Sequence, residues 1–217
     1  MGNDARRQRG PYAGTAARRL AILDAASEVF ARSGYHGGSM RDVAERLGVS
    51  HTTLLHHFSS KSELLLGVLA RRDEQSPIVQ ESETGTVAVL ARLIEMVEHN
   101  QRTPGLVELF CVLSAEATDR EHPAHEFFRR RYRMVVDHLR VALTEMSAHG
   151  GILPGLDPLE EARKTVALMD GLQVQWLLDR EGIDMAAIMR RHVNGLLTAP
   201  HIDAAREEPD RDASQPR

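Results

Sequence analysis

The sequence predicts an all-α fold. Apolar residues recur at helical spacing along most of the 217 residues, and no stretch alternates apolar and polar residues as a half-buried strand would. Ser, Asp, Gly and Pro, which often begin or end helices, separate these periodic stretches. The chain is long enough for one large domain or two small ones. It contains no apolar run of the length that a bilayer requires.

The first helix is expected from Thr15 or Ala16 to about Ser33, where Gly34 ends it. Its buried face consists of Ile22, Ala25, Ala26, Val29 and Phe30. Residues 1–15 before it contain arginines but no apolar period, so we expect them to be disordered. Such a basic arm either reaches DNA phosphates or the minor groove, or it is only a solvated tail.

Residues 39–58 have the pattern of two short helices joined by a tight turn. Ser39, with Asp42 three residues later, forms a start signal of capping-box type. The apolar face of the first helix consists of Met40, Val43, Ala44 and Leu47. Gly48 follows, where a left-handed residue can end a helix, and Ser50 is a good N-cap for the second helix.

The second helix of this pair has one apolar face and one hydrogen-bonding face. Leu54 and Phe58 lie on the same side, which leaves Thr and His residues for the other side. The residues of that outer face are His51, Thr52, Thr53 and His56. Hydrogen-bonding side chains with little charge suit a surface that reads base edges and touches phosphates in a DNA major groove. The alternative is a helix-turn-helix used only for packing.

A further helix follows directly after Phe58. Ser60 can cap it, with Glu63 three residues later, and Lys61 lies in its first turn. Its apolar face, which should close a small core against the first helix, consists of Leu64, Leu65, Val68 and Leu69. We expect this helix to end near the stretch 77–85, which contains Pro, Gly and Ser.

Residues 22–35 and 39–61 resemble the DNA-binding domain of TetR-type (TetR/AcrR) bacterial transcriptional regulators. The matching residues read IL-AA--VF---GY and then V-A-RLGVS--TL--HF-SK. The resemblance implies an N-terminal three-helix head with a helix-turn-helix, followed by a C-terminal helical domain for ligand binding and dimerisation. It also implies that Lys61 contacts a DNA phosphate. The family often has Gly in place of Thr52 and Tyr in place of Leu55. That Tyr commonly touches a phosphate, and Leu cannot donate such a hydrogen bond.

The expected organisation follows from these patterns. It comprises a disordered basic arm at 1–15, a helix-turn-helix DNA-binding domain at 16–62 with its motif at 39–58, a helical ligand-binding and dimerisation domain at 63–198, and a disordered tail at 199–217. The expected DNA-binding residues are Ser39, Arg41, Ser50, His51, Thr52, Thr53, Leu55, His56, His57 and Lys61.

Five helical patterns fill the body of the chain. Their boundaries are marked by Thr103-Pro104-Gly105, His122-Pro123, Gly150-Gly151, Asp157-Pro158, Gly182 and Asp184. The last two helices are apolar over a wider arc than one packing partner requires. They either complete a monomer core or, as the resemblance implies, form a four-helix dimer interface. The expected interface residues are Val166, Met169, Leu172, Trp176, Leu177, Ile188, Met189, His192 and Leu196.

A homodimer also follows from the needs of DNA recognition. One recognition helix reads too few base pairs to select a site in a genome, whereas two heads about 34–36 Å apart read a near-palindromic operator.

The resemblance implies a pocket for an unknown small-molecule effector between the middle helices. The expected pocket residues are Met96, His99, Phe110, Cys111, Leu113, Phe128, Tyr132, Met169, Gln173 and Trp176. Each can equally be an ordinary core residue. The polar members His99, Tyr132 and Gln173 fit a pocket best, because ligand sites need a few placed hydrogen-bonding groups.

The distribution of charge agrees with a DNA-binding head on a different kind of body. Residues 1–72 carry eleven Arg and Lys against six Asp and Glu, and residues 73–217 carry sixteen against twenty-five, for a net charge of −4. The single cysteine, Cys111, fits a reducing cytoplasm.

Patterns typical of enzymes and cofactor sites are missing from the sequence. There is no Gly-rich phosphate loop, GxSxG or HExxH pattern. His122 and His125 have the spacing of two metal ligands on one face but lack a partner Cys or carboxylate in pattern, so we expect no metal and no cofactor. The leading function is a homodimeric repressor that a small molecule releases from its operator. The alternatives are a regulator of the same fold that activates or responds to a protein, and an all-helical enzyme.

Overall fold

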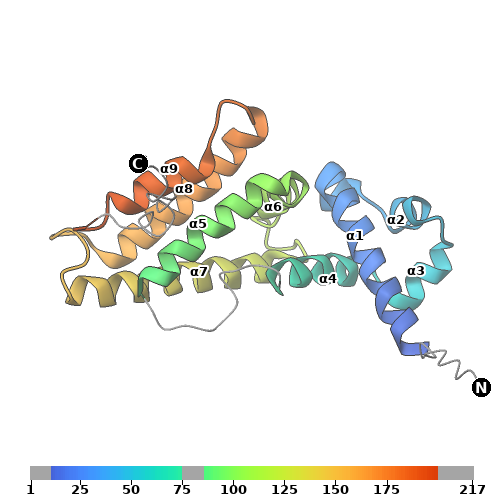
Figure 1. Cartoon of the computed structure of the whole chain (residues 1–217). Coiled ribbons are helices and arrows are strands. Elements are labelled where there is room, and N and C mark those ends of the chain that lie inside the picture. The colour runs from blue at the N-terminus through green and yellow to red at the C-terminus, as the bar shows by residue number, and fades with distance from the viewer. Residues whose placement is uncertain (1–10, 75–85, 200–217) are drawn as a thin grey trace, which may run out of the picture. The chain divides into compact units, whose positions relative to one another are not determined.

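The computed structural model of the protein describes residues 11–74 and 86–199, and these are almost entirely helical (Figure 1). The helices in these ranges are α1 (Pro11–Gly37), α2 (Met40–Leu47), α3 (His51–His57), α4 (Lys61–Glu74), α5 (Thr86–Arg102), α6 (Pro104–Glu116), α7 (His125–Ala148), α8 (Pro158–Leu178) and α9 (Met185–Asn194). The described residues add one isolated antiparallel bridge, between Ile152 and Leu197. The all-α prediction is confirmed. None of the described helices is long and apolar enough to cross a membrane.

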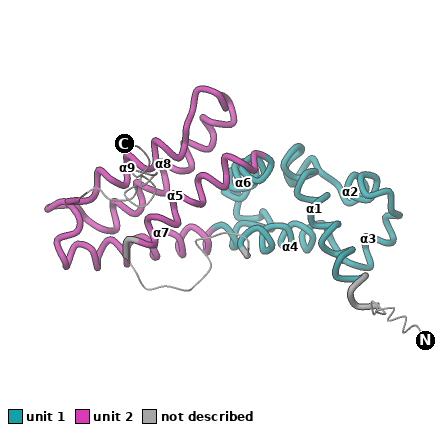
Figure 2. The backbone as a smooth tube through the Cα atoms, in the orientation of Figure 1, with its two compact units in different colours: residues 1–75, 105–128 teal, residues 76–104, 129–217 magenta. Residues whose placement is uncertain are grey.

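The chain divides into two compact units (Figure 2). Unit 1 holds residues 1–75 and 105–128, and unit 2 holds residues 76–104 and 129–217. This division differs from the expected boundary after residue 62, because α4 and α6 pack within unit 1. There the Arg72 guanidinium of α4 lies 4.3 Å from the centre of the Phe110 ring of α6.

Helix α1 starts earlier than expected and continues past its expected end. Pro11, whose fixed φ and missing N–H suit the first turn of a helix, begins it, so residues 11–15 are helical. Gly34 has φ 67° and ψ −179°, a conformation essentially restricted to glycine, and it kinks the helix. The arginines expected to form a basic arm, the stretch 77–85 and residues 200–217 of the expected tail lie outside the described residues.

The helix-turn-helix forms as its capping residues predict. Ser39 and Asp42 make both hydrogen bonds of a capping box, and Gly48 ends α2 with a left-handed φ of 64°. Ser50 caps α3 by accepting a hydrogen bond of 3.0 Å from the Thr53 N–H. The core of the head is made by the fully buried side chains Ile22, Ala26, Phe30, Val43, Leu54, Phe58, Leu64, Leu65 and Leu69.

Unit 2 is built around α5, α8 and α9. Asp157 caps α8, as expected, but α8 ends at Leu178 with Asp179 as its C-cap instead of continuing to Gly182. Asp184 caps α9, also as expected. An ion pair of 2.8 Å between Arg190 and Glu98 joins α9 to α5. Helix α7 begins at His125, shortly after the boundary expected at His122-Pro123, and residues 117–124 before it form a series of turns.

Candidate DNA-binding surface

Helix α3 presents a polar face to solvent. Leu54 and Phe58 are buried in the head. The exposed side chains of α3 are His51, Thr52, Leu55 and His56. Thr53 and His57 are half-buried, and the Thr53 hydroxyl lies 2.8 Å from the Ser50 Oγ. The face therefore offers imidazole and hydroxyl groups around one exposed leucine.

The N-terminus of α4 provides a cation beside this helix-turn-helix. The Ser59 N–H and hydroxyl both donate to the Glu63 carboxylate, and Ser60 accepts from the Glu63 N–H, so the end of the helix is capped twice. These bonds from Ser59 lower the pKa of Glu63. The Lys61 ammonium lies 4.4 Å from the centre of the Tyr35 ring and 3.4 Å from the His36 carbonyl oxygen. Lys61 is thus held in a defined place, which suits a phosphate contact.

Arg19 is a residue of this region that the sequence analysis missed. Its guanidinium lies 4.0 Å from the centre of the Phe58 ring, and it donates a hydrogen bond of 2.7 Å to the His57 carbonyl. Arg19 thereby ties α1 to the C-terminus of α3. The sequence offers only a weak indication of this role, because Arg19 is simply a cation about one turn before Ile22, the first fully buried residue of α1.

The C-terminal part of α1 meets the end of α6 in a polar and aromatic cluster. The Glu116 carboxylate accepts a hydrogen bond of 2.7 Å from the Tyr35 N–H. The buried His122 ring lies 4.9 Å from the Tyr35 ring and 5.7 Å from the His36 ring, and its Nε2 is 3.8 Å from Glu116 Oε2. Burial lowers the pKa of His122, although the negative charge of Glu116 acts in the opposite direction.

The histidines considered as metal ligands have other roles. The His122 Nδ1 accepts a hydrogen bond from the Ala124 N–H, and the His125 Nδ1 lies 2.9 Å from the Ala117 carbonyl oxygen. Among the residues that the structure describes, no three His, Cys, Asp or Glu side chains are grouped to hold a metal ion.

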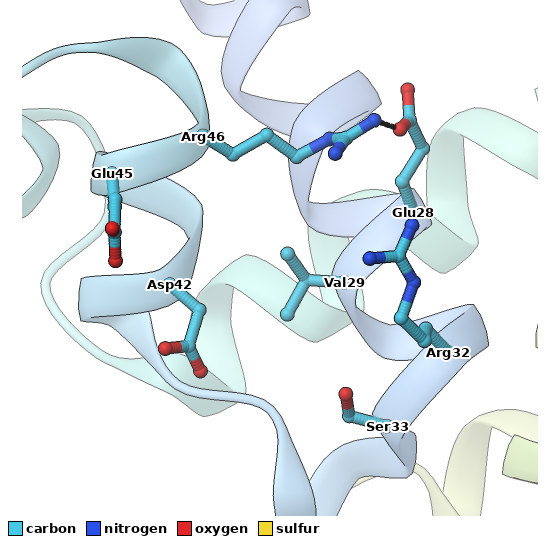
Figure 3. Close-up of a pocket in the computed structure, with 7 residues that line it drawn as sticks. All are labelled: Glu28, Val29, Arg32, Ser33, Asp42, Glu45 and Arg46. Carbon is cyan, nitrogen blue, oxygen red and sulfur yellow. Dashed lines mark ion pairs between the residues drawn. The ribbon is translucent and has the colours of Figure 1, made fainter.

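An open groove lies between α1 and α2 (Figure 3). It is lined by Glu28, Val29, Arg32, Ser33, Asp42, Glu45 and Arg46. Arg46 forms an ion pair with Glu28. The Asp42 carboxylate accepts a hydrogen bond from the Ser39 N–H in the capping box. Since carboxylates outnumber arginines here, the groove does not have the charge of a phosphate-binding surface.

The ten expected DNA-binding residues all lie in unit 1: at the N-cap of α2, on α2, at the N-cap of α3, on α3 and at the start of α4. Arg41 is exposed on α2, whereas Ser39 uses its hydroxyl in the capping box. None of the ten is buried in the core.

The expected pocket residues divide between the two units. Phe110, Cys111, Leu113 and Phe128 belong to unit 1, where the rings of Phe110 and Phe128 are 5.1 Å apart. Met96, His99, Tyr132, Met169, Gln173 and Trp176 belong to unit 2. Two of these, Met169 and Gln173, line a tightly packed interior site that has no room for a water molecule; its other residues are Val97, Asn100, Leu172, Met185 and Met189. The Tyr132 hydroxyl donates a hydrogen bond of 2.8 Å to Asp170.

Most of the expected dimer-interface residues contribute to the core of the single chain. Val166, Met169, Leu172, Trp176, Met189 and Leu196 are buried, and Leu177, Ile188 and His192 are half-buried. The His192 Nε2 bonds the Thr165 hydroxyl at 2.8 Å, within the α8–α9 pair, and burial lowers the pKa of His192. The exposed apolar residues of α8 include Val174 (50 %) and Leu178 (84 %), which the sequence analysis did not select.

Comparison with known proteins identifies both parts of the chain. Residues 22–68 match the model of bacterial regulatory proteins of the tetR family, and residues 86–198 match the model of the C-terminal region of BetI-type transcriptional repressors.

Individual relatives agree with these models. The chain is 56 % identical over 54 residues to the HTH-type transcriptional activator FasR of Mycolicibacterium smegmatis, a match that covers 25 % of each chain. It is 34 % identical over 124 residues to the HTH-type transcriptional repressor AcnR of Corynebacterium diphtheriae, covering 57 % of this chain and 58 % of AcnR. The crystal structure of a transcriptional regulator from Saccharomonospora viridis in complex with choline has a TM-score of 0.67 and 26 % identity, covering 82 % of this chain and 94 % of that one. The chain belongs to the TetR family and is a DNA-binding transcriptional regulator.

Proposed function

We propose that the protein binds a near-palindromic operator as a homodimer, represses transcription there, and leaves the DNA when a small molecule binds to unit 2. The observation that carries this proposal is the exposed face of α3, where His51, Thr52 and His56 project from a helix held by Leu54 and Phe58. These side chains donate and accept hydrogen bonds, as reading of base edges requires. The proposed activity is binding, without turnover, in the bacterial cytoplasm.

The exposed face of α8 supports the proposed dimer. Leu178 and Val174 are apolar, lie four residues apart and are therefore on the same side of the helix. A second copy that covers them would remove this apolar surface from water. Two heads joined in this way can read two half-sites, which one head cannot do with useful selectivity.

The tightly packed interior site between α5, α8 and α9 is the proposed starting point of an effector site. Its walls are mostly Met, Leu and Val, with the amides of Asn100 and Gln173 as polar groups. Both amide side chains are buried, so a ligand that entered would meet hydrogen-bonding groups in an apolar surround. A bound ligand lowers DNA affinity only if it binds the DNA-free state more tightly than the DNA-bound state.

The relative from S. viridis makes choline a reasonable first effector to test. Because this interior site has no room for a water molecule in the structure, an effector can enter only if the surrounding side chains move. Binding at this site predicts that choline weakens operator binding by the wild type and that Met189→Trp, which places a bulkier side chain there, abolishes this effect. The matched control is Val141→Trp, at an exposed position of α7 outside the proposed dimer face.

Transcriptional activation is the second candidate function, because FasR, one of the proteins that this chain resembles, is named as an activator. The two candidates differ in the sign of the effect on transcription. If the protein is a repressor, it should silence a promoter that carries the operator in a transcription assay with purified components. Increased transcription would establish activation instead, and operator binding with no effect on transcription would contradict both.

A further inference from the structure

Leu55 is the exposed apolar residue in the middle of the DNA-reading face of α3. Its side chain is 40 % exposed, whereas the neighbouring core residues Leu54 and Phe58 are 0 % exposed. It follows His51 by four residues and Thr52 by three, so it shares their side of the helix. Leu55 is therefore not one of the buried residues of the head, and part of its side chain is accessible to DNA.

The composition of α3 limits what the helix can recognise. Residues 51–57 read HTTLLHH and include no Arg, Lys, Asn or Gln, the side chains that make bidentate contacts with guanine or adenine. Hydrogen-bonding recognition by α3 is thus confined to His and Thr. The remaining exposed side chain of α3, Leu55, is apolar. The apolar group that base pairs present in the major groove is the C5-methyl of thymine.

A leucine at this position distinguishes thymine from a G·C pair for two reasons. Against a thymine methyl, both apolar surfaces leave water, which is favourable. Against the major-groove edge of a G·C pair, the leucine would cover donors and acceptors that then lack a partner, which is costly. We propose that Leu55 reads one thymine in each half-site through its methyl group and so determines specificity at that base pair. This inference rests on the proposed operator binding.

The proposal is tested by removing only the C5-methyl group of individual thymines. In the operator selected by the protein, each thymine is replaced in turn by deoxyuridine, which lacks only the C5-methyl. Wild-type affinity should fall by about fourfold for each half-site at one thymine position and hold steady at the others. 5-Bromodeoxyuridine, which restores the bulk at C5, should recover the affinity.

Two variants assign the effect to Leu55. Leu55→Ala should bind the thymine and deoxyuridine operators equally well. The matched control is Leu66→Ala on α4, because Leu66 is also 40 % exposed; this variant should keep the full sensitivity to deoxyuridine.

Three results would overturn the inference while leaving operator binding intact. They are a selected half-site without thymine, wild-type binding that is insensitive to deoxyuridine at every position, and an undiminished deoxyuridine effect in Leu55→Ala. Failure of the proposed function looks different: the wild type would then enrich no operator at all, and the inference would fall with it.

Discussion

The carboxylate of Glu116, the last residue of α6, accepts a hydrogen bond of 2.7 Å from the backbone N–H of Tyr35, 81 residues earlier in the chain. The same tyrosine lies 2.9 Å from the Ser62 Oγ through its hydroxyl and has the Lys61 ammonium 4.4 Å from its ring centre. Tyr35 therefore connects the end of α6 with the N-terminus of α4, where the proposed phosphate contact lies.

Loss of the Glu116 carboxylate should destabilise the protein. Glu116→Ala leaves the Tyr35 N–H without its charged acceptor, and we expect the free energy of unfolding to fall by about 1–3 kcal/mol. Denaturant titration measures this change. Glu116→Gln keeps an oxygen acceptor and should recover part of the loss, and Glu108→Ala, at an exposed position of the same helix, should have little effect. Equal stability of the two alanine variants would contradict the role of the Tyr35 contact.

Gly34 should tolerate no other residue without a loss of stability. Its φ of 67° with ψ −179° strains any L side chain, and an added Cβ would also meet the Glu116 carboxylate. We expect Gly34→Ala to lower the free energy of unfolding by about 1–3 kcal/mol. Gly105→Ala is the matched control, since that glycine is helical and a Cβ there meets no atom within 4 Å. Equal thermal midpoints of the two variants would contradict the claim that the backbone conformation at Gly34 strains any other residue.

Lys61 should contribute a phosphate contact without contributing sequence preference. For Lys61→Ala, the slope of log K against log salt should decrease in magnitude by about one per subunit, and the preferred operator should be unchanged. The control is Lys164→Ala in unit 2, where the lysine pairs with Glu160 and Glu161. An unchanged slope in Lys61→Ala, measured by fluorescence anisotropy over a range of salt, would exclude the contact.

Stability should decrease on mild acidification because burial lowers the pKa of His122. In the unfolded chain this imidazole titrates near pH ~6.5, so between that pH and the lower folded pKa the unfolded state binds more protons. The contribution of neutral His122 to the free energy of unfolding is therefore fully present above about pH 6.5, and it is lost as the pH falls through the pKa of His122 in the folded protein.

His122→Asn removes this titration and keeps a hydrogen-bond acceptor for the Ala124 N–H. The variant should show a smaller loss of unfolding free energy between about pH 7.5 and 5.5 than the wild type. His192, whose pKa burial also lowers, should maintain part of the dependence. His149→Asn, at an exposed site, should follow the wild type; a His122→Asn profile that coincides with it would contradict the assignment.

The helices and caps of the head were predictable because they depend on neighbours in the sequence. Ser39, Gly48 and Ser50 each act on residues within a few positions, and Leu54 and Phe58 reveal their common face by their spacing. Contacts between distant segments had no such signal. The pairing of Glu116 with Tyr35 depends on how α6 packs in unit 1, which no local pattern encodes.

The apolar helices of unit 2 illustrate a second limit. Helical spacing shows that Met189 lies on an apolar face, but it cannot say whether this chain or a second copy covers that face. In the structure Met189 is fully buried within its own chain, whereas Val174 and Leu178 are exposed. Similarly, Asp184 predicts where α9 begins, but only packing pairs His192 with Thr165.

Selection of binding sites from random duplex DNA by the purified protein tests directly whether the exposed face of α3 reads an operator sequence. It should be run beside a variant in which His51, Thr52 and His56 are all alanine; these three residues are exposed, so the fold should be retained. We expect the wild type to enrich an inverted repeat with half-site centres about one helical turn apart, or a multiple of that spacing, and the variant to lose this preference. An identical sequence preference in the two proteins, or no enrichment by the wild type, would contradict this expectation.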